Sequence, residues 1–238
     1  MELRGRLLEG QFLSRDNRFR VSVETQGETV WAHLPNSGRL TELLVPGRRV
    51  LLREPSGPAG RRPVRKTNYD LSLVELDGRW VSVNARLPND LVAEALAERR
   101  LEALLGYSSI RREVAFGQSR FDFLLQAPGR QPCLVEVKSV TLVLDGLGCF
   151  PDAVTRRGRR HLLELAAAHR EGHRATVLFV VQRADAMGMR PHDESDPDFG
   201  QALRSAAGEG VEIYAYACRV EPHVVEIADA LPVYLDSV

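Results

Sequence analysis

The hydrophobic pattern of the chain changes at Leu87-Pro88-Asn89-Asp90, and this change separates two regions of different fold class. Before it, short runs of valine, leucine and aromatic residues alternate with turn signals such as Asp77-Gly78, which predicts short strands. After it, segments with apolar residues at helical spacing alternate with strand-like segments. We therefore predict an all-β domain over residues 1–86 and a mixed α/β domain over residues 87–238.

The first region predicts a small β-barrel or sandwich, because five or six short strands are typical of such folds. The segment from Pro55 to Lys66 has no periodicity, so we expect an exposed loop there. The expected strands are Leu3–Leu13, Phe19–Thr25, Thr29–Leu34, Arg49–Arg53, Tyr69–Leu76 and Trp80–Asn84.

The second region predicts a mixed sheet with helices. Asn89 or Asp90 is a suitable N-cap for a helix that ends at Gly106, and the uniformly apolar Ala175–Gln182 predicts a central strand. Met187-Gly188-Met189 resembles a linker. The remaining expected strands are Ile110–Phe116, Phe121–Gln126, Cys133–Leu144 and Val211–Ala217, and the remaining helices are Ala153–His169 and Asp198–Ala207.

Composition excludes several classes of protein. The three cysteines lie far apart, which excludes a zinc finger and a disulfide scaffold. The 32 basic residues equal the 32 acidic residues, which argues against a histone-like binder held by charge alone. The longest apolar run, Val177 to Val181, is too short to cross a bilayer, and the N-terminal segment lacks the apolar run of a signal peptide. We therefore expect a cytoplasmic protein with no membrane partner.

The most informative segment runs from Arg111 to Leu142. Glu136 and Lys138 alternate with valines, so strand periodicity puts the acid and the lysine on one face. Asp122 lies on the preceding predicted strand, and pairing with position 136 or 138 would bring it to the same face. A symmetric six-residue turn over Ala127–Pro132 misses this register by one residue, so the trio requires a bulge or another turn length.

Such a trio has a specific chemistry. Two neighbouring carboxylates favour a divalent cation, and Mg²⁺ prefers hard oxygen ligands. A bound metal makes water easier to ionise, and a nearby lysine can orient that water or stabilise charge on a phosphate. Only two lysines, Lys66 and Lys138, stand among the 32 basic residues, and arginine does not replace a compact point charge. The alternative is a salt-bridged, solvent-exposed face at a sheet edge, which would show the same alternation.

Several motifs together resemble the sugar fermentation stimulation protein A (SfsA) family over nearly the whole chain. They are HLPNSGRL, VNARLPNDLV, GYSSIRREVAFGQSRFDFLL, CLVEVKSVTL, GCFPDAVTRRGRRHL and GVEIYAY. The resemblance implies an N-terminal OB-like barrel and a C-terminal nuclease-like domain of the PD-(D/E)xK type. Phe121-Asp122 replaces the usual Pro-Asp pair, and Glu136-x-Lys138 is intact.

The resemblance also implies site residues. Asp122 and Glu136 would bind Mg²⁺ or Mn²⁺, and Lys138 would complete the catalytic set. In several nucleases of this type an upstream glutamate helps to bind the metal. We favour Glu113 for that role, with Glu94 and Glu102 as alternatives.

Two groups of basic residues predict contacts with nucleic acid. Arginines at the start of a helix oppose the helix dipole, and a phosphate backbone would relieve this. Alternatively, these arginines form a solvent-exposed helix face that pairs with Glu164 and Asp152. His161 beside them has its own alternative, because a lone histidine is more often packed than catalytic. The helix group is Arg156, Arg157, Arg159, Arg160 and His161; the barrel group is Arg62, Arg65 and Lys66 in the irregular loop, with Asn36 and Arg39 in a turn.

The barrel group leaves alternatives open. Asn36 has an alternative role in the turn itself. Stacking aromatics would strengthen a binding role for the barrel, and Trp31, Tyr69 and Phe19 are candidates that would serve equally well as core.

Two hypotheses of function follow. The first is a nucleic-acid-binding protein with a nuclease-like domain capable of metal-dependent phosphodiester hydrolysis, with DNA favoured as the substrate and RNA as the alternative. The second is a non-catalytic, largely sequence-independent DNA-binding regulator, because the family is associated with DNA binding and with the use of sugars such as maltose. No helix-turn-helix pattern supports operator recognition. The sequence leaves open whether the protein is an enzyme and whether it forms a homodimer.

Overall fold

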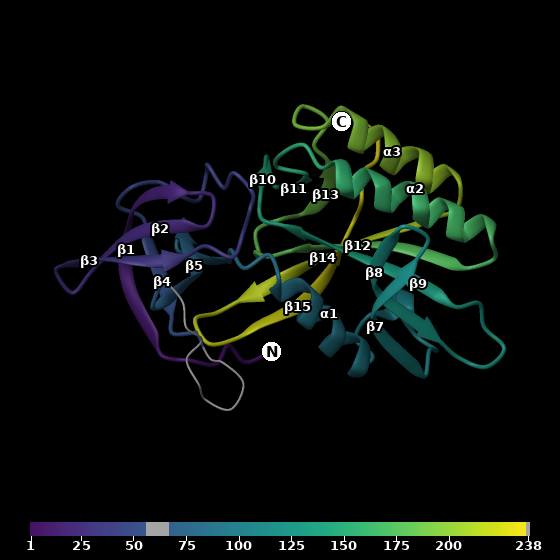
Figure 1. The fold of residues 1–238 in the computed structure, drawn as a ribbon, viewed down its shortest axis with the longest axis horizontal. Coiled ribbons are helices and arrows are strands. Elements are labelled where there is room, and N and C mark those ends of the chain that lie inside the picture. The colour runs from purple at the N-terminus through teal and green to yellow at the C-terminus, as the bar shows by residue number, and fades with distance from the viewer. Residues whose placement is uncertain (56–66, 237–238) are drawn as a thin grey trace. The chain divides into compact units, whose positions relative to one another are not determined.

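The computed structural model describes residues 1–55 and 67–236, so the predicted contacts Arg62, Arg65 and Lys66 lie outside the described residues. The chain divides into two compact units, each built from separated segments (Figure 1). Unit 1 contains residues 1–87, 182–184 and 218–226, and unit 2 contains residues 88–181, 185–217 and 227–238.

Unit 1 holds a closed five-stranded barrel. Its strands follow the order β3-β2-β1-β4-β5, and a pairing between β3 and β5 closes the ring, with β6 added beside β5. Asp77 and Gly78 form the two-residue turn between β5 and β6, both with positive φ, as a type I′ hairpin requires. The strands are β1 Leu7–Asn17, β2 Arg20–Thr25, β3 Glu28–His33, β4 Arg49–Arg53, β5 Tyr69–Leu76 and β6 Arg79–Ser82.

The barrel core comes from the inward-facing residues of these strands. Phe12, Val21 and Ala32 are buried, whereas Arg20 and Trp31 beside them are exposed. Burial of this apolar surface is the main term that holds the barrel together.

Unit 2 is built on a mixed sheet with the strand order β15-β14-β12-β9-β8-β7. Strand β12 runs parallel to β14 and to β9, whereas β8 is antiparallel to β9 and to β7. The strands of this sheet are β7 Ser109–Phe116, β8 Ser119–Gln126, β9 Cys133–Val140, β12 Arg174–Val181, β14 Glu212–Val220 and β15 Val225–Leu231.

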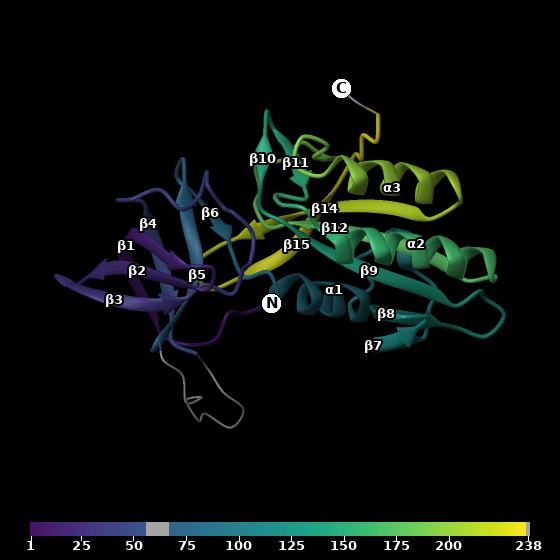
Figure 2. The same ribbon diagram turned by 45° about the horizontal axis from the view of Figure 1, so that its top comes forward.

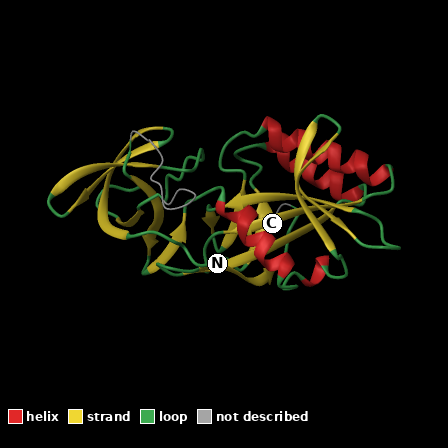
Figure 3. Ribbon diagram, turned by 60° about the horizontal axis from the view of Figure 1, so that its bottom comes forward, coloured by secondary structure: helices red, strands yellow, loops and turns green. Residues whose placement is uncertain are grey.

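Helices cover this sheet. Helices α2 and α3 lie side by side on one side (Figure 2), and α1 lies on the other (Figure 3). Leu162 and Phe199 from the two paired helices pack with Phe179 of β12 in the main core. A small sheet of β10, β11 and β13 completes the unit. These elements are α1 Leu87–Ala97, α2 Arg156–Arg170, α3 Pro197–Gly208, β10 Val143–Leu144, β11 Leu147–Phe150 and β13 Gly188–Pro191.

The predicted fold class, a barrel followed by a mixed α/β domain, is confirmed, and so is the central position of β12. Three local predictions are wrong. The first predicted helix begins at Leu87 and ends at Ala97, because Arg99 adopts a left-handed conformation (φ +60°) and the Arg100 N–H bonds back to the Ala95 carbonyl. The segment through Leu104 is a separate 3₁₀-helix, η2 Glu102–Leu104.

The predicted linker at Met187–Met189 and the single strand Cys133–Leu144 are also wrong. Residues 188–191 form β13, which pairs in parallel with β11 and buries Met189 completely. Strand β9 ends at Val140, and Val143 pairs with Gly148 in the small sheet instead. Within the described residues, no helix is long and apolar enough to span a membrane.

Candidate functional site

The register of β8 and β9 brings Asp122 opposite Glu136. Phe123 pairs with Val135 and Leu125 pairs with Cys133, and one further step along both strands reaches the two acids. The pairing of β8 with β9 is therefore offset by one residue from the register that the symmetric six-residue turn considered from the sequence would give. This offset is what a shared face for Asp122 and Glu136 requires.

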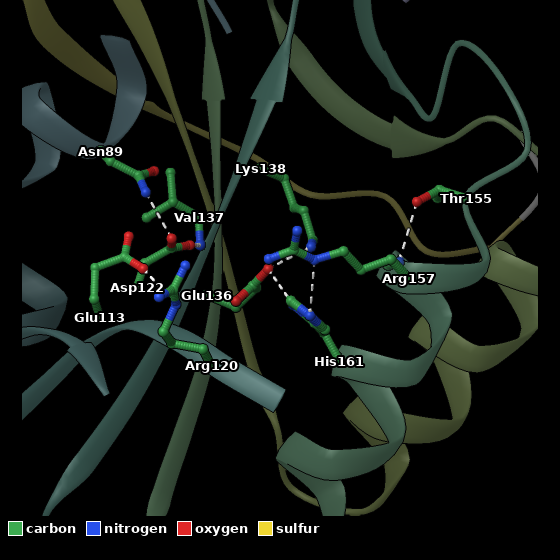
Figure 4. A network of polar contacts seen from close by, with 11 residues as sticks. Asn89, Glu113, Arg120, Asp122, Glu136, Val137, Lys138, Thr155, Arg157 and His161 are labelled. Carbon is green, nitrogen blue, oxygen red and sulfur yellow. Dashed lines mark hydrogen bonds and ion pairs between the residues drawn. The ribbon is translucent and has the colours of Figure 1, made fainter. Parts of the chain in front are cut away.

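Both carboxylate oxygens of Asp122 accept hydrogen bonds. Oδ2 accepts from the Val137 backbone N–H at 2.7 Å, and Oδ1 accepts from the Asn89 side-chain amide of α1 at 2.6 Å (Figure 4). Burial, and then the negative charge of Glu136, raise the Asp122 pKa above its ordinary value, and these two bonds offset only part of the rise. Asn89 was predicted only as a helix cap, so sequence analysis missed this contact.

Glu136 is buried between two nitrogen-bearing side chains. Its Oε1 accepts from the Lys138 ammonium at 2.7 Å and is also bonded to Nδ1 of His161. Burial acts to raise the Glu136 pKa, but Lys138 and His161 outweigh it and hold the pKa below its ordinary value. The second oxygen, Oε2, is buried and has no hydrogen-bond partner among the described residues. Such an orphaned carboxylate oxygen calls for an explanation.

Helix α2 supplies the other side of the site. Its N-cap, Thr155, accepts a hydrogen bond from the Gly158 N–H, which fixes the first turn. His161 is buried, and its Nε2 accepts from Nε of Arg157 at 3.3 Å. Since Nε2 accepts a hydrogen bond here, the ring proton lies on Nδ1, and the Nδ1–H group donates a hydrogen bond to Glu136. Figure 4 shows Arg157 reaching from the helix toward Glu136 and Lys138.

The remaining predicted helix arginines do not enter the site in the same way. Arg159 forms an ion pair with Asp198 of α3, and Arg156 and Arg160 are exposed at the first turns of α2. The predicted helix group therefore separates into one residue that points to the carboxylates and three that line the surface beside them.

Glu113 lies on β7 at the position opposite Asp122, between the pairs Arg112–Phe123 and Val114–Phe121. Its φ of +54° is a left-handed conformation that a non-glycine residue rarely adopts, and such strain is concentrated at functional sites. The Glu113 carboxylate is exposed and bonded to Arg120 at 2.7 Å (Figure 4).

The other two upstream acids do not share this position. Glu94 is paired with Arg100 at 3.6 Å, and Glu102 is exposed on η2. Within residues 1–55 and 67–236 there is no cluster of three or more histidine, cysteine, aspartate or glutamate side chains arranged to hold a metal ion.

The predicted barrel residues in the described part of the chain, Asn36 and Arg39, lie in unit 1. Asn36 is buried; its amide nitrogen donates to the Val83 carbonyl at 3.1 Å, and its amide oxygen accepts from the Gly38 N–H at 2.8 Å. The side chain therefore serves the turn, which was the alternative interpretation. Arg39 is exposed. Phe19 and Trp31 are exposed rather than part of the core, whereas Tyr69 packs against it.

Comparison with known proteins identifies the family. Residues 86–224 match the sugar fermentation stimulation protein RE domain, and residues 13–83 match the SfsA N-terminal OB domain. The chain belongs to the SfsA family. A sugar fermentation stimulation protein homolog of Moorella thermoacetica is 49% identical over 95% of this chain and 96% of its own length.

Other SfsA relatives match at similar coverage. A homolog of Geobacter sp. (strain M21) is 45% identical over 99% of this chain and 100% of its own length. The solved structure of Pyrococcus furiosus SfsA in complex with Ca²⁺ is 30% identical, covers 98% of each chain and superposes with a TM-score of 0.87. The predicted family resemblance is thus confirmed.

Proposed function

We propose that this SfsA protein binds nucleic acid and hydrolyses its phosphodiester bonds with a divalent cation held by Asp122 and Glu136. The observation that carries the proposal is the buried, unpartnered Oε2 of Glu136 on the strand position opposite a second carboxylate. Each carboxylate disfavours the ionised state of its neighbour, and a cation between them removes this repulsion.

The donor set fits Mg²⁺ or Mn²⁺. Carboxylate oxygens are hard ligands, and Mg²⁺ needs only one or two of them because it keeps several waters. The Pyrococcus furiosus relative was solved with Ca²⁺, which also prefers oxygen ligands. Glu113 stands beside Asp122 as a third ligand once Arg120 moves away. Such a cation supplies a more acidic water and stabilises charge on a phosphate oxygen.

The chain's own residues then have separate roles. Lys138 gives a compact positive charge on the face of Glu136, suited to orienting the attacking water or stabilising the phosphate. His161 holds Glu136 in place through Nδ1. Arg157 offers its guanidinium to the scissile phosphate, because it alone among the four helix arginines is bonded to His161.

The surface arginines of α2 would contact the phosphate backbone on either side. Arg156, Arg159 and Arg160 lie within the first turns of the helix, and contacts to phosphates carry no sequence information. We therefore propose binding that depends little on sequence. DNA is the proposed partner because of the family's association with DNA binding.

Three measurements test this function. Calorimetric titration with MgCl₂ or MnCl₂ should show binding to the wild type and none to Glu136→Gln. Labelled single- and double-stranded DNA and RNA should be cut only with metal. Binding measured in EDTA should weaken with salt, and replacement of the four α2 arginines by alanine should reduce the slope. An unchanged slope would place the contact elsewhere.

A second candidate is a DNA-binding regulator without catalysis, which the family's association would link to maltose metabolism. One observation favours the absence of a catalytic metal. Both oxygens of Asp122 already accept hydrogen bonds, so a cation must displace Asn89 or share an oxygen with it. Retained DNA binding without cleavage of any substrate, and with no metal uptake, would select this candidate over the nuclease.

A further inference from the structure

The outer face of the barrel carries large aromatic side chains that the core does not use. Val21 and Ala32 pair across β2 and β3 and are fully buried, so the alternate positions Arg20, Trp31 and His33 point outward. Phe19 lies in the turn before β2, and its ring contacts that of His33. Phe19 is 47% exposed and Trp31 is 56% exposed. We call this outer surface the aromatic face and define it by Arg18, Phe19, Arg20, Trp31 and His33.

Arginines are stacked on these rings. The Arg18 guanidinium lies 5.5 Å from the centre of the Phe19 ring, and that of Arg20 lies 5.4 Å from the centre of the Trp31 ring. The ring of His33 lies 6.3 Å from that of Phe19. The aromatic face therefore presents flat rings and positive charges in alternation, the two groups that a single strand of nucleic acid engages.

The aromatic face is held in place by a second layer of contacts. Arg15 donates to the Arg18 carbonyl at 2.7 Å and to the Gly38 and Arg39 carbonyls at 2.7 and 2.8 Å. It thereby ties the turn that carries Phe19 to the turn that carries Arg39. Such pre-organisation lowers the entropy that a ligand must remove on binding.

The charges of the face also decide between ligands. The acid beside it, Asp16, is engaged by Ser14, Ser22 and Arg20, and the Ser22 hydroxyl lowers the Asp16 pKa most; the exposed Glu24 lies further along β2. Arg18 and Arg39 add positive charge at the edge. OB barrels use this strand face for oligonucleotides and for oligosaccharides. The excess of arginine favours the polyanion.

We propose that the aromatic face binds single-stranded nucleic acid, with bases stacked on Phe19 and Trp31 and phosphates on Arg18, Arg20 and Arg39. The inference rests on the proposed function for the class of ligand and deepens it by naming the strandedness. A duplex keeps its bases stacked inside the helix, so it cannot use these rings.

The chain contains only two tryptophans, Trp31 and Trp80, which makes the test direct. In Trp80→Phe, Trp31 is the only tryptophan reporter. We expect its fluorescence to be quenched saturably by an oligothymidine of about 12 nucleotides in EDTA, a length within the site sizes of OB folds. A duplex of matched length should quench it far less.

Affinity measurements complete the design. Phe19→Ala and Trp31→Ala should each weaken binding of the oligothymidine by about 5- to 100-fold, the effect of losing one stacked base. Trp31→Phe keeps a ring and should keep most of the affinity. The matched control is Trp80→Ala, since Trp80 also lies under an arginine, Arg49, but elsewhere on the barrel.

Three outcomes would overturn the proposal: no quenching of Trp31, equal affinities for the Phe19, Trp31 and Trp80 variants, or quenching by malto-oligosaccharides in place of the oligonucleotide. Because these experiments contain no metal, they stand apart from cleavage. A protein that passes them and cuts nothing would contradict only the nuclease, and a protein that cuts but fails them would contradict only the aromatic face.

Discussion

Two clusters of charged side chains, one in each unit, have nearly the same contact distances and opposite surroundings. In unit 2, Lys138 lies 2.7 Å from Glu136, and their side chains are 10% and 6% exposed. In unit 1, Arg49 lies 2.9 Å from Glu75 and also bonds Glu9, with Arg49 50% exposed. The difference in exposure, not in distance, sets what each contact does.

Water explains the contrast. Around Arg49 it solvates any group whose partner is removed, so exposed pairs contribute little to stability. Around Glu136 it is excluded, so removal of one partner leaves a buried charge without compensation. Arg49 also lowers the Glu9 pKa by a hydrogen bond. The buried cluster keeps an unused oxygen, and this is what makes it a candidate site.

The largest expected effect is on cleavage. Lys138→Arg should lower the rate of metal-dependent hydrolysis by about 100-fold or more, since a planar guanidinium does not reproduce a compact ammonium in an acid–base or charge-stabilising role. The control is the reverse exchange at the surface, Arg49→Lys, which should cleave at the wild-type rate. Initial rates on labelled DNA measure both. Equal rates for wild type and Lys138→Arg would reject the role of Lys138.

The next effect is on stability. Glu136→Gln should lower the free energy of unfolding by about 3 kcal/mol, because Lys138 loses its buried counter-charge. Urea denaturation measures this, with Glu9→Gln as the surface counterpart that leaves the midpoint unchanged. The double variant Glu136→Gln with Lys138→Met should recover much of the loss, since no buried charge remains at the pair. A double variant as unstable as the single one would contradict this account.

Asp122 should respond in the opposite direction. Its pKa is raised by burial and by Glu136, so ionised Asp122 costs folding free energy at pH values above the ordinary pKa of an aspartate, and this cost disappears at lower pH. Asp122→Asn should therefore raise the free energy of unfolding at neutral pH, by about 1 kcal/mol, while it abolishes metal binding. Urea midpoints across the acidic range should converge for the two proteins. A destabilised variant at neutral pH would show that the two hydrogen bonds dominate.

The smallest effect is expected at the surface cluster itself. Arg49→Ala should leave the unfolding midpoint and the cleavage rate unchanged within error, although it uncovers Trp80. Thermal denaturation and the labelled-DNA assay check this. A clear loss of stability would mean that the exposed network couples to the barrel core more than its exposure indicates.

Sequence patterns predicted the parts of the fold that depend on local chemistry. Strands β4 and β5 have the expected bounds, and Asp77-Gly78 forms the expected tight turn. Patterns fail where long-range packing decides, as at Met189, which a parallel partner strand converts from linker to buried core. A left-handed Arg99 likewise has no signal in an otherwise helical run.

The candidate site could likewise be predicted only in part from the sequence. Alternation placed Glu136 and Lys138 on one face, but the register that brings Asp122 opposite depends on a turn whose length the residues do not fix. The direction of Arg157 and the contact from Asn89 arise from α2 and α1 packing near one pair of strands. Apolar alternation also does not distinguish an inward ring from an outward one, so Phe19 and Trp31 stayed undecided.

The segmented make-up of unit 1 has a consequence for how the chain emerges from the ribosome. Residues 182–184 and 218–226 belong to it, with Ser82 donating to the Gln182 side chain at 2.8 Å and Arg53 to the Pro222 carbonyl at 2.9 Å. Most multidomain chains complete the N-terminal domain first during synthesis. Here the barrel core lies within the first 87 residues, but the unit gains its last segments only when residue 226 has left the exit tunnel. We expect a nascent chain stalled after residue 87 has left the tunnel to form the barrel core, and to reach its full resistance to proteases only when nearly the whole protein has been made.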